Sequence, residues 1–199
     1  MVGLSDYFRE CFALVAGWLM ETGHRGKLHL RPKEMSLTLS RKLMTAFRRA
    51  EDLLRLLIWE LAAELAPTLI LAEPRPRTST ARTPKPWRWG FRPFPDRRNK
   101  QPALEALLAR GAPSARNRPE IDRLLARFQT LSSLAADPLP TARRMARRLA
   151  RMKAARALLP VALPLVKRAV RLPTELSMIA DMQVYSVNDA MRGYFFDTG

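Results

Sequence analysis

The chain has 199 residues, of which 47% are hydrophobic, a content that argues against wholesale disorder and suits one domain, with or without appendages. Thirty-five lysines and arginines stand against 18 acidic residues, so the formal net charge is +17 and the isoelectric point lies near 11.4. This charge favours a polyanionic partner, namely nucleic acid, an anionic membrane surface or an acidic protein.

The chain contains a single cysteine, Cys11, which excludes an intrachain disulfide and favours a reducing compartment. The apolar run of residues 11–20 follows Arg9 and Glu10 without a basic region before them, so it does not resemble a secretory signal. No window reaches the ~18 uninterrupted apolar residues of a spanning helix. We therefore expect a cytoplasmic protein without a transmembrane segment.

Residues 1–72 are predicted to form an N-terminal helical region. Its first helix should run from Asp6 to Met20 and end at the glycines that follow, which can take positive φ. The next segment alternates briefly, so it predicts either a short strand or, in preference, a loop that leads to a helix cap. Two serines, Ser36 and Ser40, are candidates for that cap.

The clearest periodicity runs from Ser40 to Ala66 and predicts a long amphipathic helix. Glu51 and Asp52 are placed to pair with arginines on neighbouring turns. One stripe of apolar residues has the 4-3-4-3-4 spacing of a heptad repeat and must be buried, either within the chain or against a partner. We call this stripe the seam; it comprises Leu43, Phe47, Ala50, Leu54, Leu57 and Leu61.

Residues 73–102 form a connector with seven prolines, which exclude a central strand or a helix and favour an extended chain. Its sequence "KPWRWGFRPFP" alternates rings with cations. It predicts either an arm whose rings stack on unpaired bases or a strap that folds back on its own domain. We favour the strap, because three exposed rings would form an exposed hydrophobic patch, which soluble proteins rarely carry. The residues concerned are Trp87, Trp89, Phe91, Arg88 and Arg92.

Residues 103–173 are predicted to be helical and to end in a basic segment, and residues 174–199 to form a last helix and a tail. A short helix should start at Pro102 and stop at Gly111. An amphipathic helix should follow from Pro119 to about Ala136. The last helix is predicted from Thr174 to about Tyr194, with buried positions at Leu176, Ile179, Met182 and Val187.

A basic helix is predicted between the helix that ends near Ala136 and the last helix. Thr141 is its predicted cap. Residues 138–174 contain ten cations and no acid, whereas a solvated helix face normally mixes both signs. Repulsion among the cations costs stability unless an anion lies nearby. We therefore predict that this helix binds a polyanion through seven residues, namely Arg143, Arg144, Arg147, Arg148, Arg151, Lys153 and Arg156.

The sequence offers little that suggests catalysis. It has no phosphate-binding glycine loop, no CxxC pair and no HExxH motif. His24 and His29 are interpreted as an ordinary loop pair, and the final "FDTG" as a chance match to an aspartic-protease signature. Glu60 and Glu64, one turn apart, are interpreted as solvent-facing charges on a helix edge. We predict no catalytic residue, no metal site and no cofactor.

Together these patterns predict an all-α fold. Its small core should be built from the first helix, the long helix and the helix that starts at Pro119, with the connector and the basic helix around it. The predicted function is non-enzymatic binding of nucleic acid phosphates with little sequence selectivity. One alternative is a scaffold or assembly subunit that binds protein partners through the seam and the connector. Attachment to a membrane surface is a third hypothesis.

Overall fold

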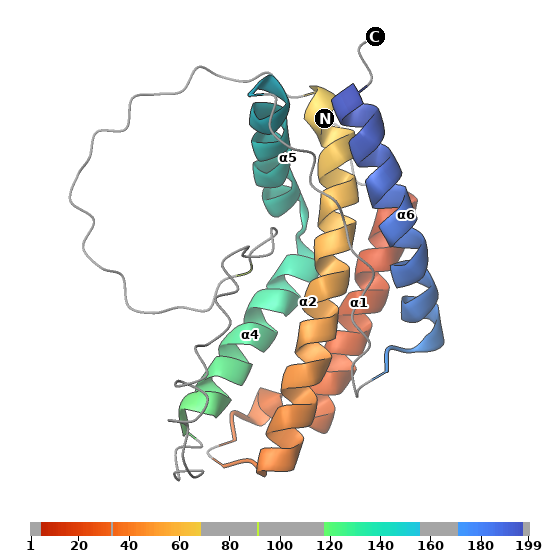
Figure 1. The fold of residues 1–199 in the computed structure, drawn as a ribbon. Coiled ribbons are helices and arrows are strands. Elements are labelled where there is room, and N and C mark those ends of the chain that lie inside the picture. The colour runs from red at the N-terminus through yellow and green to blue at the C-terminus, as the bar shows by residue number, and fades with distance from the viewer. Residues whose placement is uncertain (1–4, 33, 69–90, 92–117, 156–170, 197–199) are drawn as a thin grey trace, which may run out of the picture.

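The computed structural model describes residues 5–32, 34–68, 91, 118–155 and 171–196, and the regular elements in these ranges are all helical (Figure 1). The prediction of an all-α fold is confirmed. The short helix predicted after Pro102 lies outside the described residues. So does the connector except for Phe91.

Helix α1, Asp6–Arg25, is five residues longer than predicted. Gly23 was expected to end it but lies inside it, with φ in the ordinary negative range. The glycine is needed for close packing instead, since a Cβ atom there would lie 2.6 Å from the ring of Phe128 on helix α4, Arg118–Ala136. Gly26 follows the helix and makes an equally close approach to Leu43.

A 3-10 turn, η1 at Leu28–Leu30, takes the place of the short strand that we considered. Helix α2, Leu37–Leu65, then begins three residues before the predicted start. Ser36 is its cap, because the Ser36 hydroxyl accepts a hydrogen bond of 3.3 Å from the backbone N–H of Leu39. Ser40, the other candidate, lies buried inside the helix.

Helix α2 is the central element, and all four other α-helices of the described residues pack against it (Figure 1). Every residue from Leu56 to Ala63 is buried, so the C-terminal part of α2 is covered on all sides. The seam residues are buried within the single chain, with Phe47, Ala50, Leu54 and Leu57 fully enclosed. The 3-10 turn η2, Ala66–Thr68, follows directly.

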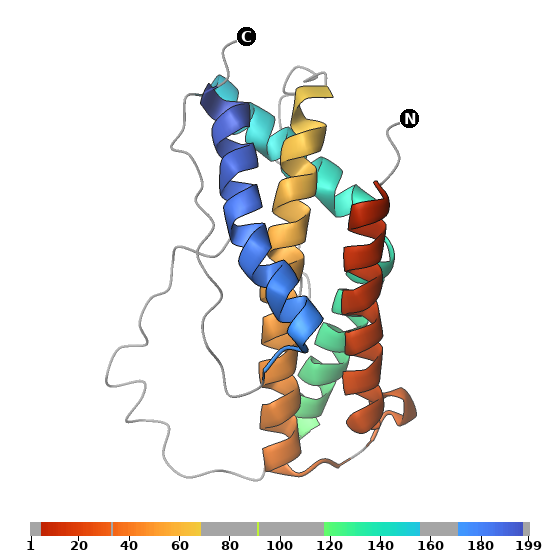
Figure 2. The same cartoon turned by 90° about the vertical axis from the view of Figure 1, so that its right-hand side faces the viewer.

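Three further helices complete the described fold: α4, Arg118–Ala136; α5, Leu139–Ala154; and α6, Thr174–Phe196. Figure 2 shows α6 in blue along the upper part of α2 and α1 in red at its middle and lower part, and both helices contact α2. We expected the basic helix α5 to lie outside the core, and this is wrong. Its residues Met145 and Leu149 are buried in the same cluster as the α2 seam.

Two details of these helices also differ from the prediction. Helix α5 starts at Leu139, directly after Pro138, and not after Thr141. Pro140 lies in its first turn, where proline is well suited because the backbone N–H needs no partner. On α6, Leu176 and Val187 are buried and Ile179 is partly buried, as expected, but Met182 is 63% exposed. Met182 points away from α2 because it lies on the opposite face of α6.

A buried ionic cluster joins α2 to α4. Glu51 is only 5% exposed, and its carboxylate accepts hydrogen bonds from Arg55 on α2 and from Arg127 on α4. Arg55 also donates to Asp52 over 2.7 Å. Burial lowers the pKa of Arg127 despite the neighbouring Glu51 carboxylate. The guanidinium of Arg127 is therefore held inside the protein by Glu51.

Replacing Glu51 with glutamine should destabilise the protein by about 3–5 kcal/mol, because it leaves the buried guanidinium of Arg127 without the Glu51 carboxylate. Chemical unfolding of the variant would measure this loss. Glu21→Gln is the matched control, since the Arg25–Glu21 pair lies on the surface and should contribute little. Equal, small effects of the two substitutions would contradict a stabilising role for the cluster.

The seam yields a second prediction. Leu54 is fully buried, so Leu54→Ala should lower the free energy of unfolding by about 2–5 kcal/mol through weaker packing and a residual cavity. Leu30→Ala is the control, because Leu30 is 66% exposed and its truncation should change stability little. If Leu54→Ala left stability intact but dissociated a complex, the seam would be an interface instead of a core.

Candidate polyanion-binding surface

Helix α5 separates its residues into an apolar and a cationic face. Small alanines at 142, 146 and 150, together with Met145 and Leu149, pack inward against α2 and the rest of the core. Small side chains allow close packing of α5 and leave the long side chains between them to point outward. The exposed face, which we call the cationic face, consists of Arg143, Arg144, Arg147, Arg148 and Arg151.

The positive charge of the cationic face is not balanced by acidic residues on α5 itself. No acidic residue occurs on α5. Among the described residues, the side chains of Arg143, Arg147 and Arg151 form no ion pair or hydrogen bond. Arg144 is held along its own helix, where it donates to the Pro140 carbonyl (3.2 Å) and to the Thr141 hydroxyl (3.0 Å). Neighbouring guanidinium groups therefore concentrate positive potential on one side of the molecule.

The other two predicted cations do not belong to this face. Lys153 is partly buried, and its ammonium nitrogen lies 4.9 Å from the ring centroid of Tyr194 on α6, in a cation–π contact. Lys153 therefore helps to join the C-terminal ends of α5 and α6. Arg156 lies outside the described residues.

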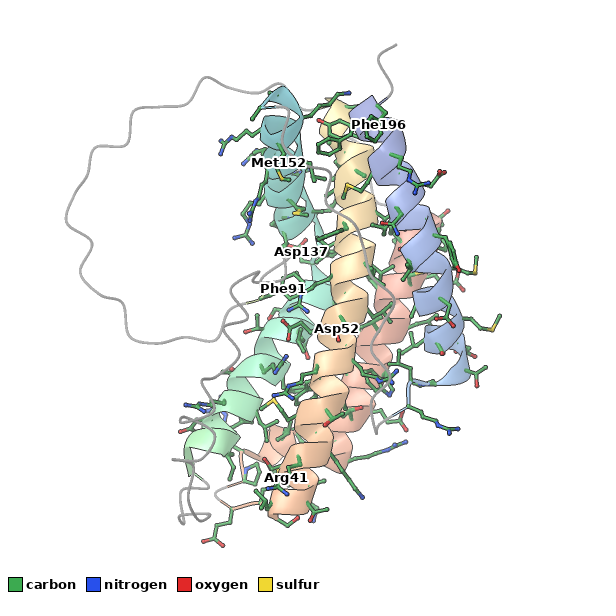
Figure 3. The ribbon with its side chains drawn as sticks, in the orientation of Figure 1. Arg41, Asp52, Phe91, Asp137, Met152 and Phe196 are labelled. Carbon is green, nitrogen blue, oxygen red and sulfur yellow. The ribbon has the colours of Figure 1, made fainter. Side chains whose placement is uncertain are left out.

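A groove with a volume of about 740 Å³ adjoins the cationic face where α4 is followed by α5. Two of its lining residues, Phe91 and Asp137, are labelled in Figure 3. Its apolar wall includes Leu134 and Met145, and the guanidinium groups of Arg144 and Arg148 line it on the α5 side. The groove thus combines apolar surface with hydroxyls, two cations and one acidic residue, Asp137. Its other lining residues are Thr130, Ser133, Pro140 and Thr141.

Phe91 is the one described residue of the aromatic stretch. Its ring is partly buried against the core, and the guanidinium carbon of Arg55 lies 5.9 Å from the ring centroid. Phe91 thereby connects the groove to the ionic cluster around Glu51. The remaining residues of the predicted strap or arm, Trp87, Trp89, Arg88 and Arg92, lie outside the described residues.

The structure corrects our interpretation of Glu60. This residue is 7% exposed, and its carboxylate accepts a hydrogen bond from Ser186 on α6. Glu64 does reach the surface, where partial burial and the neighbouring Glu60 raise its pKa. The sequence could not indicate the burial of Glu60, because Ser186 is 126 positions away.

Tyr7, Cys11 and Gln183 lie close to Glu60 in a polar cluster that sequence reasoning missed. Gln183 is fully buried and donates a hydrogen bond of 2.7 Å to the Tyr7 hydroxyl. Tyr7 is 45% exposed, and the partial burial of its hydroxyl side raises its pKa to about 12. Burial also raises the pKa of the Cys11 thiol. A neutral thiol is a poor nucleophile, so the arrangement favours a structural role for Cys11.

The raised pKa of Tyr7 predicts a pH effect. The folded protein favours the neutral phenol, so the associated stability is present below pH 10, the ordinary pKa, and is lost as pH rises from 10 to about 12. Tyr7→Phe should remove this part of the pH dependence of unfolding. The difference between wild-type and variant tyrosinate absorbance should show a midpoint near pH 12. A midpoint near 10 would contradict the burial argument.

The two histidines stack on each other, with ring centroids 4.6 Å apart, which the sequence did not indicate. No group of three or more histidine, cysteine or acidic side chains placed to hold a metal ion occurs in the described part of the chain. None of the described helices has the length and apolar character needed to cross a membrane. Comparison with family models, curated proteins and solved structures finds no match for this chain.

Proposed function

We propose that this protein is a non-enzymatic binding protein whose cationic face contacts the phosphates of nucleic acid with little sequence selectivity. The observation that carries the proposal is the face itself: five exposed arginines on one rigid helix without an acidic residue on that helix. Arginine forms bidentate hydrogen bonds to phosphate oxygens, and repeated phosphates match cations repeated along a helix.

The packing of α5 supports this proposal. The apolar residues of α5 are used in the core, so the helix is anchored and its arginines are presented from a fixed backbone. Phosphate contacts of this kind supply affinity and orientation but no base discrimination, which accounts for the expected low selectivity.

The alternative of an assembly subunit that binds partners through the seam is disfavoured, because the seam is buried inside the chain. A scaffold would therefore need another surface. An acidic protein or an anionic membrane could also be attracted to the cationic face, and both are distinguishable by experiment.

The proposal predicts the behaviour of a quadruple variant, R143Q/R144Q/R147Q/R148Q. Its binding to mixed-sequence nucleic acid should be weaker than that of the wild type. The slope of log K against log salt should also become shallower, by about 0.7 for each phosphate that is no longer neutralised on a single strand, or about 0.9 on a duplex. Fluorescence anisotropy at several salt concentrations would measure both quantities.

The matched control is R9Q/R25Q/R41Q/K42Q, which also removes four positive charges, but from exposed positions on α1 and α2. It should retain most of the binding and the original slope. If both quadruple variants lost affinity equally, net charge and not the cationic face would be responsible. Binding to anionic vesicles in preference to RNA and DNA would support membrane attachment instead.

A further inference from the structure

Helix α6 is apolar on two opposite faces. Its inner face, with Leu176, Val187 and Met191, packs into the core. Its outer face leaves Met178, Met182, Tyr185 and Phe196 between 62% and 80% exposed. Met178, Met182 and Tyr185 are neighbours at helical spacing, and Asp189 and Arg192 separate them from Phe196. Exposed apolar side chains that gather on one helix face commonly mark an interaction site.

The outer residues of α6 follow a regular pattern. Met178, Met182, Tyr185, Asp189, Arg192 and Phe196 are spaced 4-3-4-3-4, which is the repeat of a coiled-coil seam. We call them the α6 stripe. All six are exposed, and neither Asp189 nor Arg192 forms an ion pair within the described part of the chain.

The spacing of the α6 stripe is the same in both directions, so it is self-complementary in an antiparallel arrangement. Two copies related by a two-fold axis would place Met178 opposite Phe196, Met182 opposite Arg192, and Tyr185 opposite Asp189. In this register the tyrosine hydroxyl can donate to the facing carboxylate. Every layer then contains one apolar or aromatic side chain and one partner that it can accommodate.

Charge also favours a second copy at this position. Helix α6 carries Glu175, Asp181 and Asp189 against one cation, Arg192, whereas α5 carries six cations and no acid. In the antiparallel register, Arg192 of one copy lies beside Asp181 of the other, and two-fold symmetry makes this contact twice. Two strongly basic chains can therefore approach through α6 with less repulsion than through the cationic face.

We infer that the protein forms a two-fold symmetric homodimer through antiparallel pairing of the α6 stripes. Such an isologous contact uses the same surface on both chains. It leaves the cationic faces uncovered, because α5 and α6 pack on α2 through their own separate inner faces.

Sedimentation equilibrium of the full chain tests this inference. The sample is treated with nuclease and measured at about 1 M salt, where the Debye length is about 3 Å and electrostatic association is suppressed. The measured mass therefore reports dimer formation independently of nucleic acid binding. Between about 1 µM and 1 mM protein, the mass should approach twice the 22.7 kDa of one chain. A monomer throughout this range would overturn the dimer.

Two substitutions locate the interface. Met182→Arg puts a cation into the α6 stripe opposite Arg192 of the second copy and should raise the dimer Kd by about tenfold or more. Met20→Arg is the matched control, since Met20 is exposed on α1 and its replacement should leave the Kd unchanged. If both substitutions weakened the dimer equally, α6 would not be the interface.

Disulfide trapping tests the register with near-native chains. When a Met178→Cys chain is mixed with a Phe196→Cys chain and oxidised, a mixed disulfide should form. Met178→Cys alone should form none, because its two copies lie at opposite ends of the paired segment, about 27 Å apart at 1.5 Å per residue. The native Cys11 is buried and does not compete. A disulfide from Met178→Cys alone would overturn the antiparallel register.

Discussion

The burial of α2 is the constraint on which the rest of the structure depends. A helix whose residues are enclosed from Leu56 to Ala63 cannot exist in water alone, because too much apolar surface would stay hydrated. The other described helices supply the cover, and each contributes an apolar stripe to it. Once these stripes face α2, the positions of the outward-facing residues on α1, α4, α5 and α6 follow from helix geometry.

The cationic face, for which we propose polyanion binding, follows from the same constraint. On α5 the buried positions are mainly alanines, so the apolar contribution of the helix is modest while its charge is high. Repulsion among neighbouring arginines opposes helix formation, and burial of Met145 and Leu149 offsets it. An anion bound across the arginines would relieve the same repulsion. Stability and binding on this helix are therefore expected to be coupled: ligand binding should stabilise the fold.

Periodicity made much of the fold predictable from the sequence. Heptad spacing located α2 and its seam, and a run of ten cations without an acid located the basic helix α5. Long-range contacts were not predictable. Gly23 was interpreted as a helix terminator because sequence alone cannot show the ring of Phe128, which requires a residue without Cβ. Glu60 was assigned to the surface for the same reason, since its partner Ser186 belongs to the last helix.

The lack of long-range information in the sequence also explains why the exposed apolar side chains of α6 were not predicted. Its two apolar faces give it little amphipathic contrast, so the sequence did not reveal which face meets α2, and Met182 was assigned to the wrong one. Only with the inner face occupied by Leu176, Val187 and Met191 does the outer stripe stand out as surplus apolar surface. An apolar stripe that is exposed on a single chain is commonly covered by a partner. In the proposed dimer, the acidic character of α6, in a chain of net charge +17, would direct the second copy away from the arginines of α5. The proposed assembly and the proposed polyanion binding would then use opposite charges on separate helices, so the two surfaces would not overlap.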